Sequence, residues 1–157
     1  MKKASALAVV LATWFGCGLT PIGPGTAGSA AAVLIAVALH GWAGLAPFWF
    51  AILGAALIPP GVWSAGAVAR ALNRTDPGIV VVDEVIGQWI TIAGAGALNL
   101  RSWIAAFVLF RLFDIWKPPP VRRLEKLHGG AGIGADDVMA GVYGAVVMIV
   151  LGYFRLY

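Results

Sequence analysis

Charged residues are scarce in this sequence, and they are missing from a long stretch near its beginning. Only 11% of the 157 residues are charged and 61% are hydrophobic, whereas an average soluble domain is about 25% charged. No Asp, Glu, Lys or Arg occurs between Lys3 and Arg70. A soluble domain of this length would have too little polar surface to cover so large an apolar core. The composition therefore predicts a membrane protein.

Other absences narrow the function further. A single cysteine, Cys17, excludes a disulfide within the chain. No arginine stands six residues after it, which argues against a cysteine-based phosphatase loop. The net charge of +4 is explained by membrane orientation, and no nucleic-acid-binding module is visible. Because linkers, low-complexity tails and convincing internal repeats are also missing, we expect one domain over residues 1–157.

The apolar stretches predict an all-α, polytopic membrane bundle. A spanning helix needs about 20 apolar residues; the first charge-free stretch can hold two spans and 138–154 can hold one. Shorter stretches at 85–100 and 102–110 are marginal alone and need flanking residues or a short, tilted hairpin. Helices are expected at 4–15, 29–45, 47–72, 84–98, 102–115 and 137–154, with a kink or break at Pro59-Pro60-Gly61. This gives about five crossings, with 4–15 lying at the interface or entering partway.

The segments between these helices indicate the orientation of the chain. They are rich in Gly and Pro and cover 16–28, 73–82 and 116–135. With the expected crossings, all three lie on the same side of the membrane. Basic residues gather in the last two segments or at their edges, namely Arg70, Arg74, Lys117, Arg122, Arg123 and Lys126. Because basic loops favour the cytoplasmic side, this shared side is expected to face the cytoplasm.

Acidic residues mark the same side as functional. Five of the seven lie in or beside apolar stretches, at the expected helix ends: Asp83, Glu84, Asp114, Asp136 and Asp137. Carboxylates are costly near hydrocarbon, so a membrane protein that keeps several of them uses them. Their hard oxygens suit Mg²⁺, or Mn²⁺. Taken singly, each could instead stabilise a helix start, or, for Asp114, pair with Arg111 three residues away.

The first Gly-rich segment offers a phosphate site at a loop-to-helix junction. Its backbone N–H groups and hydroxyls form a candidate cradle, although it is not a Walker loop. The candidate phosphate-binding residues are Thr20, Gly25, Thr26, Ser29 and, from a later loop, His128. His128 would act there as a proton shuttle or form only a flexible turn. Lys117 or Arg111 would neutralise charge building on the phosphate.

Four blocks of sequence resemble the phosphatidylglycerophosphatase A family, and they occur in family order from about Trp14 to Gly141. They are Gly18-Leu-Thr-Pro-Ile-Gly-Pro-Gly-Thr-Ala-Gly-Ser29, Val82-Asp-Glu-Val-Ile-Gly-Gln-Trp-Ile90, Phe110-Arg-Leu-Phe-Asp-Ile-Trp-Lys-Pro118 and His128-Gly-Gly-Ala-Gly-Ile-Gly-Ala-Asp-Asp-Val-Met-Ala-Gly141. The resemblance implies a Mg²⁺-requiring lipid phosphatase of the bacterial inner membrane. Such an enzyme removes the terminal phosphate of phosphatidylglycerol phosphate, leaving phosphatidylglycerol and inorganic phosphate. It also implies that the five acidic residues carry metal and catalysis.

A mechanism can be assigned to these residues. Asp83, Asp114 and Asp137 are expected to supply metal oxygens, while Glu84 or Asp136 completes that set or deprotonates the attacking water. Direct attack by a metal-activated water is preferred over an aspartyl-phosphate intermediate. The Asp-x-Asp-x-Thr/Val motif that such an intermediate needs is absent.

Two other functions fit parts of the sequence. A small ion transporter or channel component would use the acidic cluster as a cation route, and it predicts carboxylates near the middle of the membrane. A non-catalytic assembly protein would pack its Gly- and Ala-rich helices against partners. It predicts that neutralising single carboxylates leaves function intact.

Overall fold

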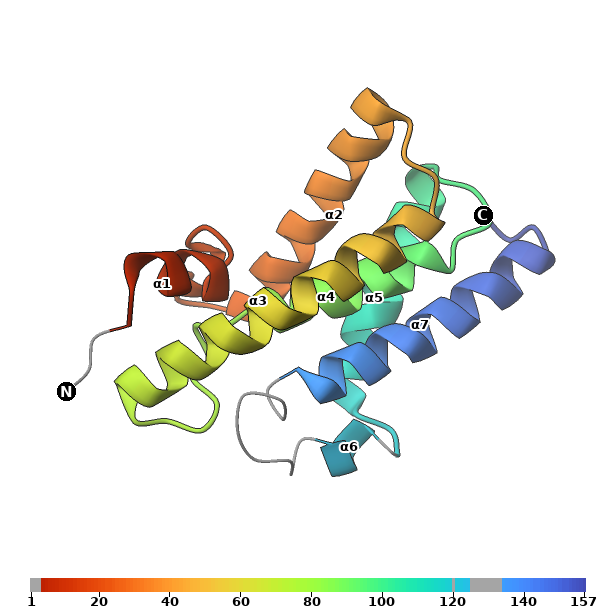
Figure 1. Cartoon of the computed structure of the whole chain (residues 1–157). Coiled ribbons are helices and arrows are strands. Elements are labelled where there is room, and N and C mark those ends of the chain that lie inside the picture. Colours follow the sequence, from red (N-terminus) through yellow and green to blue (C-terminus); the bar gives the residue numbers. More distant parts are fainter. Residues whose placement is uncertain (1–3, 120, 125–133) are drawn as a thin grey trace.

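The computed structural model describes residues 4–119, 121–124 and 134–157, and this part of the chain is helical without strands. The helices are α1 (Ala6–Ala12), the 3-10 turn η1 (Cys17–Leu19), α2 (Pro24–Ala43), α3 (Phe48–Leu72), α4 (Val82–Ala93), α5 (Leu100–Trp116), α6 (Val121–Leu124) and α7 (Ala135–Tyr153). The predicted all-α class is confirmed. Figure 1 shows the long helices α2, α3 and α7 around the shorter α4.

The bundle contains three candidate membrane spans. Within the described ranges, α2, α3 and α7 are long and apolar enough to cross a bilayer, as judged by length and composition. The other two expected crossings fall on α4 and α5, with 12 and 17 residues. At 1.5 Å per residue, α4 is about 18 Å long, short of the roughly 30 Å hydrocarbon layer. The count of about five crossings stays a prediction.

Two helices differ from their expected bounds around proline. α2 begins at Pro24 rather than at residue 29, because proline suits the first turn of a helix. Gly23, immediately before the helix, has the left-handed conformation. α3 continues through Pro59 and Pro60, so the alternative of a break there is wrong. Neither proline ring is buried. The following Gly61 is buried against α4, and this packing supports α3 where the two prolines lack N–H groups.

α4 is the centre of the bundle, in contact with α2, α3, α5 and α7. It runs parallel to α7, since Gly87 lies against Gly141 and, further along, Thr91 lies against Gly144. The order of contacts with α3 is reversed, so α3 is antiparallel to α4.

α2 follows the direction of α4. The first turn of α2 lies against Glu84 near the start of α4. Further along both helices, the Trp89 Nε1 of α4 donates a hydrogen bond of 3.0 Å to the Ala32 carbonyl oxygen of α2. α5 has the opposite direction, because Trp103 near its start meets the Phe50 ring edge to face at the far end, while Arg111 lies beside Gly25. Consequently α2, α4 and α7 begin at one end of the bundle, where α3 and α5 finish.

Glycine allows α4 and α7 to approach at backbone distance. A Cβ at residue 141 would lie 2.5 Å from the Gly87 carbonyl oxygen, and one at residue 144 would lie 2.6 Å from the Thr91 hydroxyl. The Thr91 hydroxyl lies 3.2 Å from the Gly141 carbonyl oxygen and donates to it across the interface. Small residues of this kind let membrane helices pack closely. The contact brings the first turns of the two helices together.

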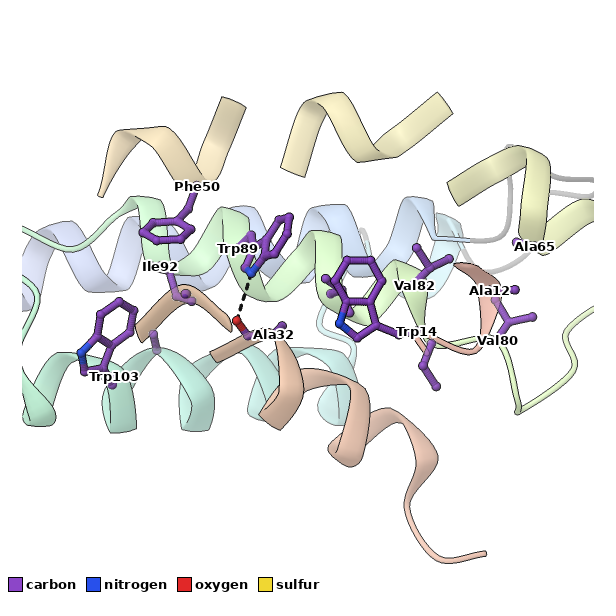
Figure 2. Packing of buried hydrophobic residues seen from close by; sticks show 14 of the residues in the cluster. Ala12, Trp14, Ala32, Phe50, Ala65, Val80, Val82, Trp89, Ile92 and Trp103 are labelled. Carbon is purple, nitrogen blue, oxygen red and sulfur yellow. Dashed lines mark hydrogen bonds between the residues drawn. The ribbon is translucent and has the colours of Figure 1, made fainter. Parts of the chain in front are cut away.

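The apolar core holds the N-terminal segment against this end. Figure 2 shows Trp14 and Trp89 in the same cluster, and their rings meet edge to face with centroids 5.8 Å apart. The Val81 N–H donates to the Ala12 carbonyl oxygen at 2.8 Å, tying the end of α1 to the start of α4. With seven residues, α1 is shorter than the expected helix at 4–15 and too short to span a bilayer.

Candidate metal and phosphate site

Three carboxylates meet where α4 and α7 begin. Asp83 and Glu84 stand in the first turn of α4, Asp137 stands in the first turn of α7, and one oxygen of each lies within 4.8 Å of the others. The Asp83 and Asp137 side chains are only 9% and 6% exposed. Negative charges this close and this buried repel each other strongly unless a cation lies among them.

The unpaired oxygens of this cluster fit a metal ion. Glu84 Oε2 and Asp137 Oδ1 are buried, and neither has a hydrogen-bond partner in the described part of the chain. Buried polar atoms normally have hydrogen-bond partners, so two unpaired carboxylate oxygens within one cluster indicate a ligand. All the candidate donors are carboxylate oxygens, the ligand type that Mg²⁺ and Mn²⁺ prefer. The residues therefore fit the predicted cofactor class.

Helix geometry explains why the acids gather here. A helix start carries partial positive charge, which favours Asp and Glu in the first turn. Both α4 and α7 have two acids there, and the two helices start side by side because they are parallel. Gly134, with φ +95°, immediately precedes α7 and lies against Asp83. A Cβ added at residue 134 would be 3.0 Å from the Asp83 Cβ.

The other two predicted ligands have cationic partners. Arg111 forms a short ion pair with Asp114, one turn later on α5. Lys117 Nζ lies 2.8 Å from Asp136 Oδ2 and donates to it. The structure thus divides the five predicted acids into a central group of three and two ion-paired ones. Direct metal ligation by Asp114 or Asp136 stays a prediction.

The start of α2 adds a bare helix N-terminus to the site. A Cβ at residue 25 would lie 2.3 Å from Glu84 Oε1 and 3.2 Å from Arg111 Nη1, so Gly25 lies directly against both side chains. Unlike α4 and α7, α2 has no acid in its first turn, and, like them, it has no side-chain cap. The first N–H groups of a helix have no partners within it, and they bind anions such as phosphate.

The structure places the predicted phosphate-binding residues unequally. Thr26 is exposed in the first turn of α2, beside Gly25. Thr20 is exposed and donates to the Cys17 carbonyl oxygen at 3.0 Å, while the buried Ser29 hydroxyl donates to the Gly25 carbonyl oxygen at 2.9 Å. His128 lies outside the described residues. Gly25 and Thr26 are therefore the best placed, and binding by the others stays a prediction.

One polar residue near the site was missed by the sequence analysis. Gln88 stands one turn after Glu84 and is completely buried, and its amide oxygen and nitrogen have no hydrogen-bond partner among the described residues. Arg111 Nε is also buried, with no hydrogen-bond partner in the part of the chain that the structure describes. The sequence did contain a signal for Gln88, a lone amide four residues after Glu84 in an apolar helix. Residues at that spacing share a helix face, so Gln88 could have been placed beside Glu84.

The apolar bundle and the buried carboxylate cluster at one end of it define a membrane protein with a candidate cation site at the helix ends. Comparison with known proteins then identifies the family. The family model described as phosphatidylglycerophosphatase A matches residues 10–152, which is most of the chain. The chain belongs to this family of phosphatases, as its sequence blocks indicated.

Several relatives match over nearly the full chain. The phosphatidylglycerophosphatase A proteins of Escherichia coli and Haemophilus influenzae are 38% and 37% identical to it, over 92% and 99% of this chain and 83% and 96% of theirs. A Bacteroides thetaiotaomicron protein, provisionally named phosphatidylinositol-3-phosphatase, is 41% identical over 96% of both chains. No solved structure matches.

Proposed function

We propose that this enzyme hydrolyses the terminal phosphate of phosphatidylglycerol phosphate with the help of Mg²⁺ or Mn²⁺, giving phosphatidylglycerol and inorganic phosphate. The observation that carries the proposal is the convergence of three helix starts. Two of them, α4 and α7, bring buried carboxylates together, and the third, α2, presents free N–H groups beside Arg111. Family membership supplies the lipid substrate.

Asp83, Glu84 and Asp137 would hold the cation. Their positions support this assignment because two of their oxygens lack partners and no cationic side chain is paired with them in the described residues. A bound Mg²⁺ would polarise the phosphoryl group and make a water molecule more acidic.

The phosphate would bind between α2 and α5. The first-turn N–H groups of α2 and the Thr26 hydroxyl would donate to its oxygens, and Arg111 would offset the charge that grows on them. Lys117, held by Asp136, would add a second cationic group near the start of α7. These donors come from rigid helices, so they favour a fixed phosphate orientation.

Hydrolysis would proceed by direct attack of water on phosphorus. Asp136, or the Glu84 oxygen that does not hold the cation, would accept the proton of the water as its oxygen forms the new bond to phosphorus. The bond between phosphorus and the glycerol oxygen breaks, and the leaving oxygen takes up a proton in turn. Each step uses only water and the lipid, so atoms and charge balance.

We also propose that the chain lies in the bacterial inner membrane with this site facing the cytoplasm. Arg70, Arg74, Lys117 and Arg122 belong to the ends and loops on the site side of the bundle. The rule that basic loops remain cytoplasmic supports this orientation.

The headgroup deserves a direct comparison, because one relative bears a phosphatidylinositol-3-phosphatase name. Both lipids carry a phosphomonoester beyond the phosphodiester, so the same chemistry would act on either. The assay therefore measures phosphate release from phosphatidylglycerol phosphate and phosphatidylinositol 3-phosphate side by side. We expect the first to be cleaved with the higher kcat/KM. The ion-transport alternative receives no support from the comparisons.

The decisive experiment uses purified protein in detergent, with Mg²⁺ and then with a chelator. We expect phosphate release that stops on chelation, and Asp83→Asn and Asp137→Asn variants that lose turnover by at least about a thousandfold, about 4 kcal/mol of transition-state stabilisation. Arg101→Gln, an exposed change at the opposite end of the bundle, serves as the control. Folded Asn variants with full activity would remove those residues from the mechanism, and wild-type protein without release would reject the function.

A further inference from the structure

A cavity of about 260 Å³ opens between α3 and α7, with Asp83 in its wall. The rest of its lining is apolar or glycine and comes from α3, α4 and the start of α7, with Ile58 and Val62 contributed by α3. Small residues contribute to this lining, with Gly61 and Ala65 on α3 and Gly134 and Ala135 at the start of α7. It is thus an apolar chamber that ends at one member of the carboxylate cluster.

Two of the three helices that line this cavity are candidate membrane spans. α3 and α7 are two of the three helices able to span a bilayer. Ile58 at the rim is 36% exposed, and Trp63 on α3 and Val142 and Val146 on α7 are exposed apolar residues. A molecule in the cavity can therefore keep contact with hydrocarbon on one side while it touches Asp83 on the other.

The two sides of the cluster differ in chemistry. Asp83 faces the apolar cavity, whereas Glu84 lies against Gly25 and Arg111 on the α2 and α5 side. An amphiphile with a phosphate at one end matches these two sides. Its apolar part would lie in the cavity and its phosphate would point towards Arg111. A free sugar phosphate or nucleotide would gain nothing from the cavity.

We propose that this cavity is the lipid-entry subsite, which admits the substrate sideways from the bilayer between α3 and α7 and holds its glycerol backbone and the first acyl carbons. The inference rests on the proposed phosphatase function. The volume fits part of a lipid only, since pockets for whole drug-sized ligands measure about 300–1,000 Å³. The remaining acyl chain stays in the bilayer.

The test compares long-chain phosphatidylglycerol phosphate with its deacylated, water-soluble headgroup, glycerophosphoglycerol phosphate. Val62→Phe fills the cavity wall, and Ile58→Phe narrows its half-exposed rim, where folding tolerates a larger ring. The control is Ile52→Phe on the same helix, which is 49% exposed and outside the cavity. Thermal midpoints with and without Mg²⁺ report folding and cation binding for each variant.

We expect both cavity variants to lose at least about tenfold in kcat/KM on the long-chain lipid, with the deacylated headgroup cleaved as by the wild type. The Mg²⁺-dependent shift in midpoint and the control should not change. Equal kcat/KM for the long-chain lipid in wild type and Ile58→Phe, or an equal loss on both substrates, would overturn the entry subsite. If wild-type protein cleaved neither substrate, the proposed function itself would fail instead.

Discussion

Replacing Gly25 by alanine tests whether the start of α2 shapes the carboxylate cluster proposed to act in catalysis. The new Cβ would lie 2.3 Å from Glu84 Oε1, whereas ordinary contact begins near 3.4 Å. Because the neighbouring atom belongs to a side chain, Glu84 can move away without unfolding the bundle. Arg111 Nη1, at 3.2 Å, limits the directions available to it.

The size of the effect follows from the displacement. Glu84 must shift its carboxylate by about 1 Å, and a misplacement of about 1 Å in a catalytic geometry costs roughly 100-fold in rate. This corresponds to about 2.7 kcal/mol of lost transition-state stabilisation. Stability should not fall in parallel, since alanine favours a helix over glycine by up to about 1 kcal/mol.

The assay measures kcat/KM for phosphatidylglycerol phosphate together with Mg²⁺ affinity by calorimetry. Gly41→Ala is the matched control, because it makes the same change in the same helix at a position where a Cβ meets nothing within 4 Å. We expect the control to keep its activity while Gly25→Ala loses about 100-fold. Gly25→Ala protein with wild-type kcat/KM and Mg²⁺ affinity would refute the role given to Glu84.

Two further variants probe the interior of the bundle. Gln88→Leu removes a buried amide that has no hydrogen-bond partner among the described residues, so the thermal midpoint should rise or stay the same. If the amide helps to position Glu84, kcat/KM falls by at least about tenfold. Higher stability with full activity would deny the amide that role. Gly141→Ala places a Cβ 2.5 Å from the Gly87 carbonyl oxygen, and overpacking of this kind costs about 1–3 kcal/mol. Its thermal midpoint in detergent should drop by several degrees, and an unchanged midpoint would show that α4 and α7 can separate freely.

The meeting of the acids at one end of the bundle could be predicted from the sequence. Asp83 and Glu84 open one apolar helix and Asp136 and Asp137 open another, and an even number of crossings between them puts both starts on the same side. The division of the acids could not be predicted. Whether Asp114 turns to a metal or to Arg111 depends on side-chain positions that spacing alone leaves open.

The start of α2 was misplaced for a local reason. Gly23-Pro24-Gly25 has the composition of a turn, yet proline at the first helical position and a left-handed glycine before it begin a helix equally well. The expected phosphate cradle therefore became the first turns of a helix, and Ser29 used its hydroxyl inside that helix. The cavity beside Asp83 had no sequence signal, because its lining comes from three helices that are distant along the chain.

The parallel pairing of α4 and α7 has a consequence for how the enzyme is made. Chains emerge from the ribosome N-terminus first, and contacts between distant segments form late. A nascent chain inserted only as far as α5 can place Glu84 beside Gly25, but it lacks Asp137. If Asp137 holds the cation as proposed, catalysis begins only when α7 has docked along Gly87 and Thr91, and a half-inserted chain does not act on the lipids around it.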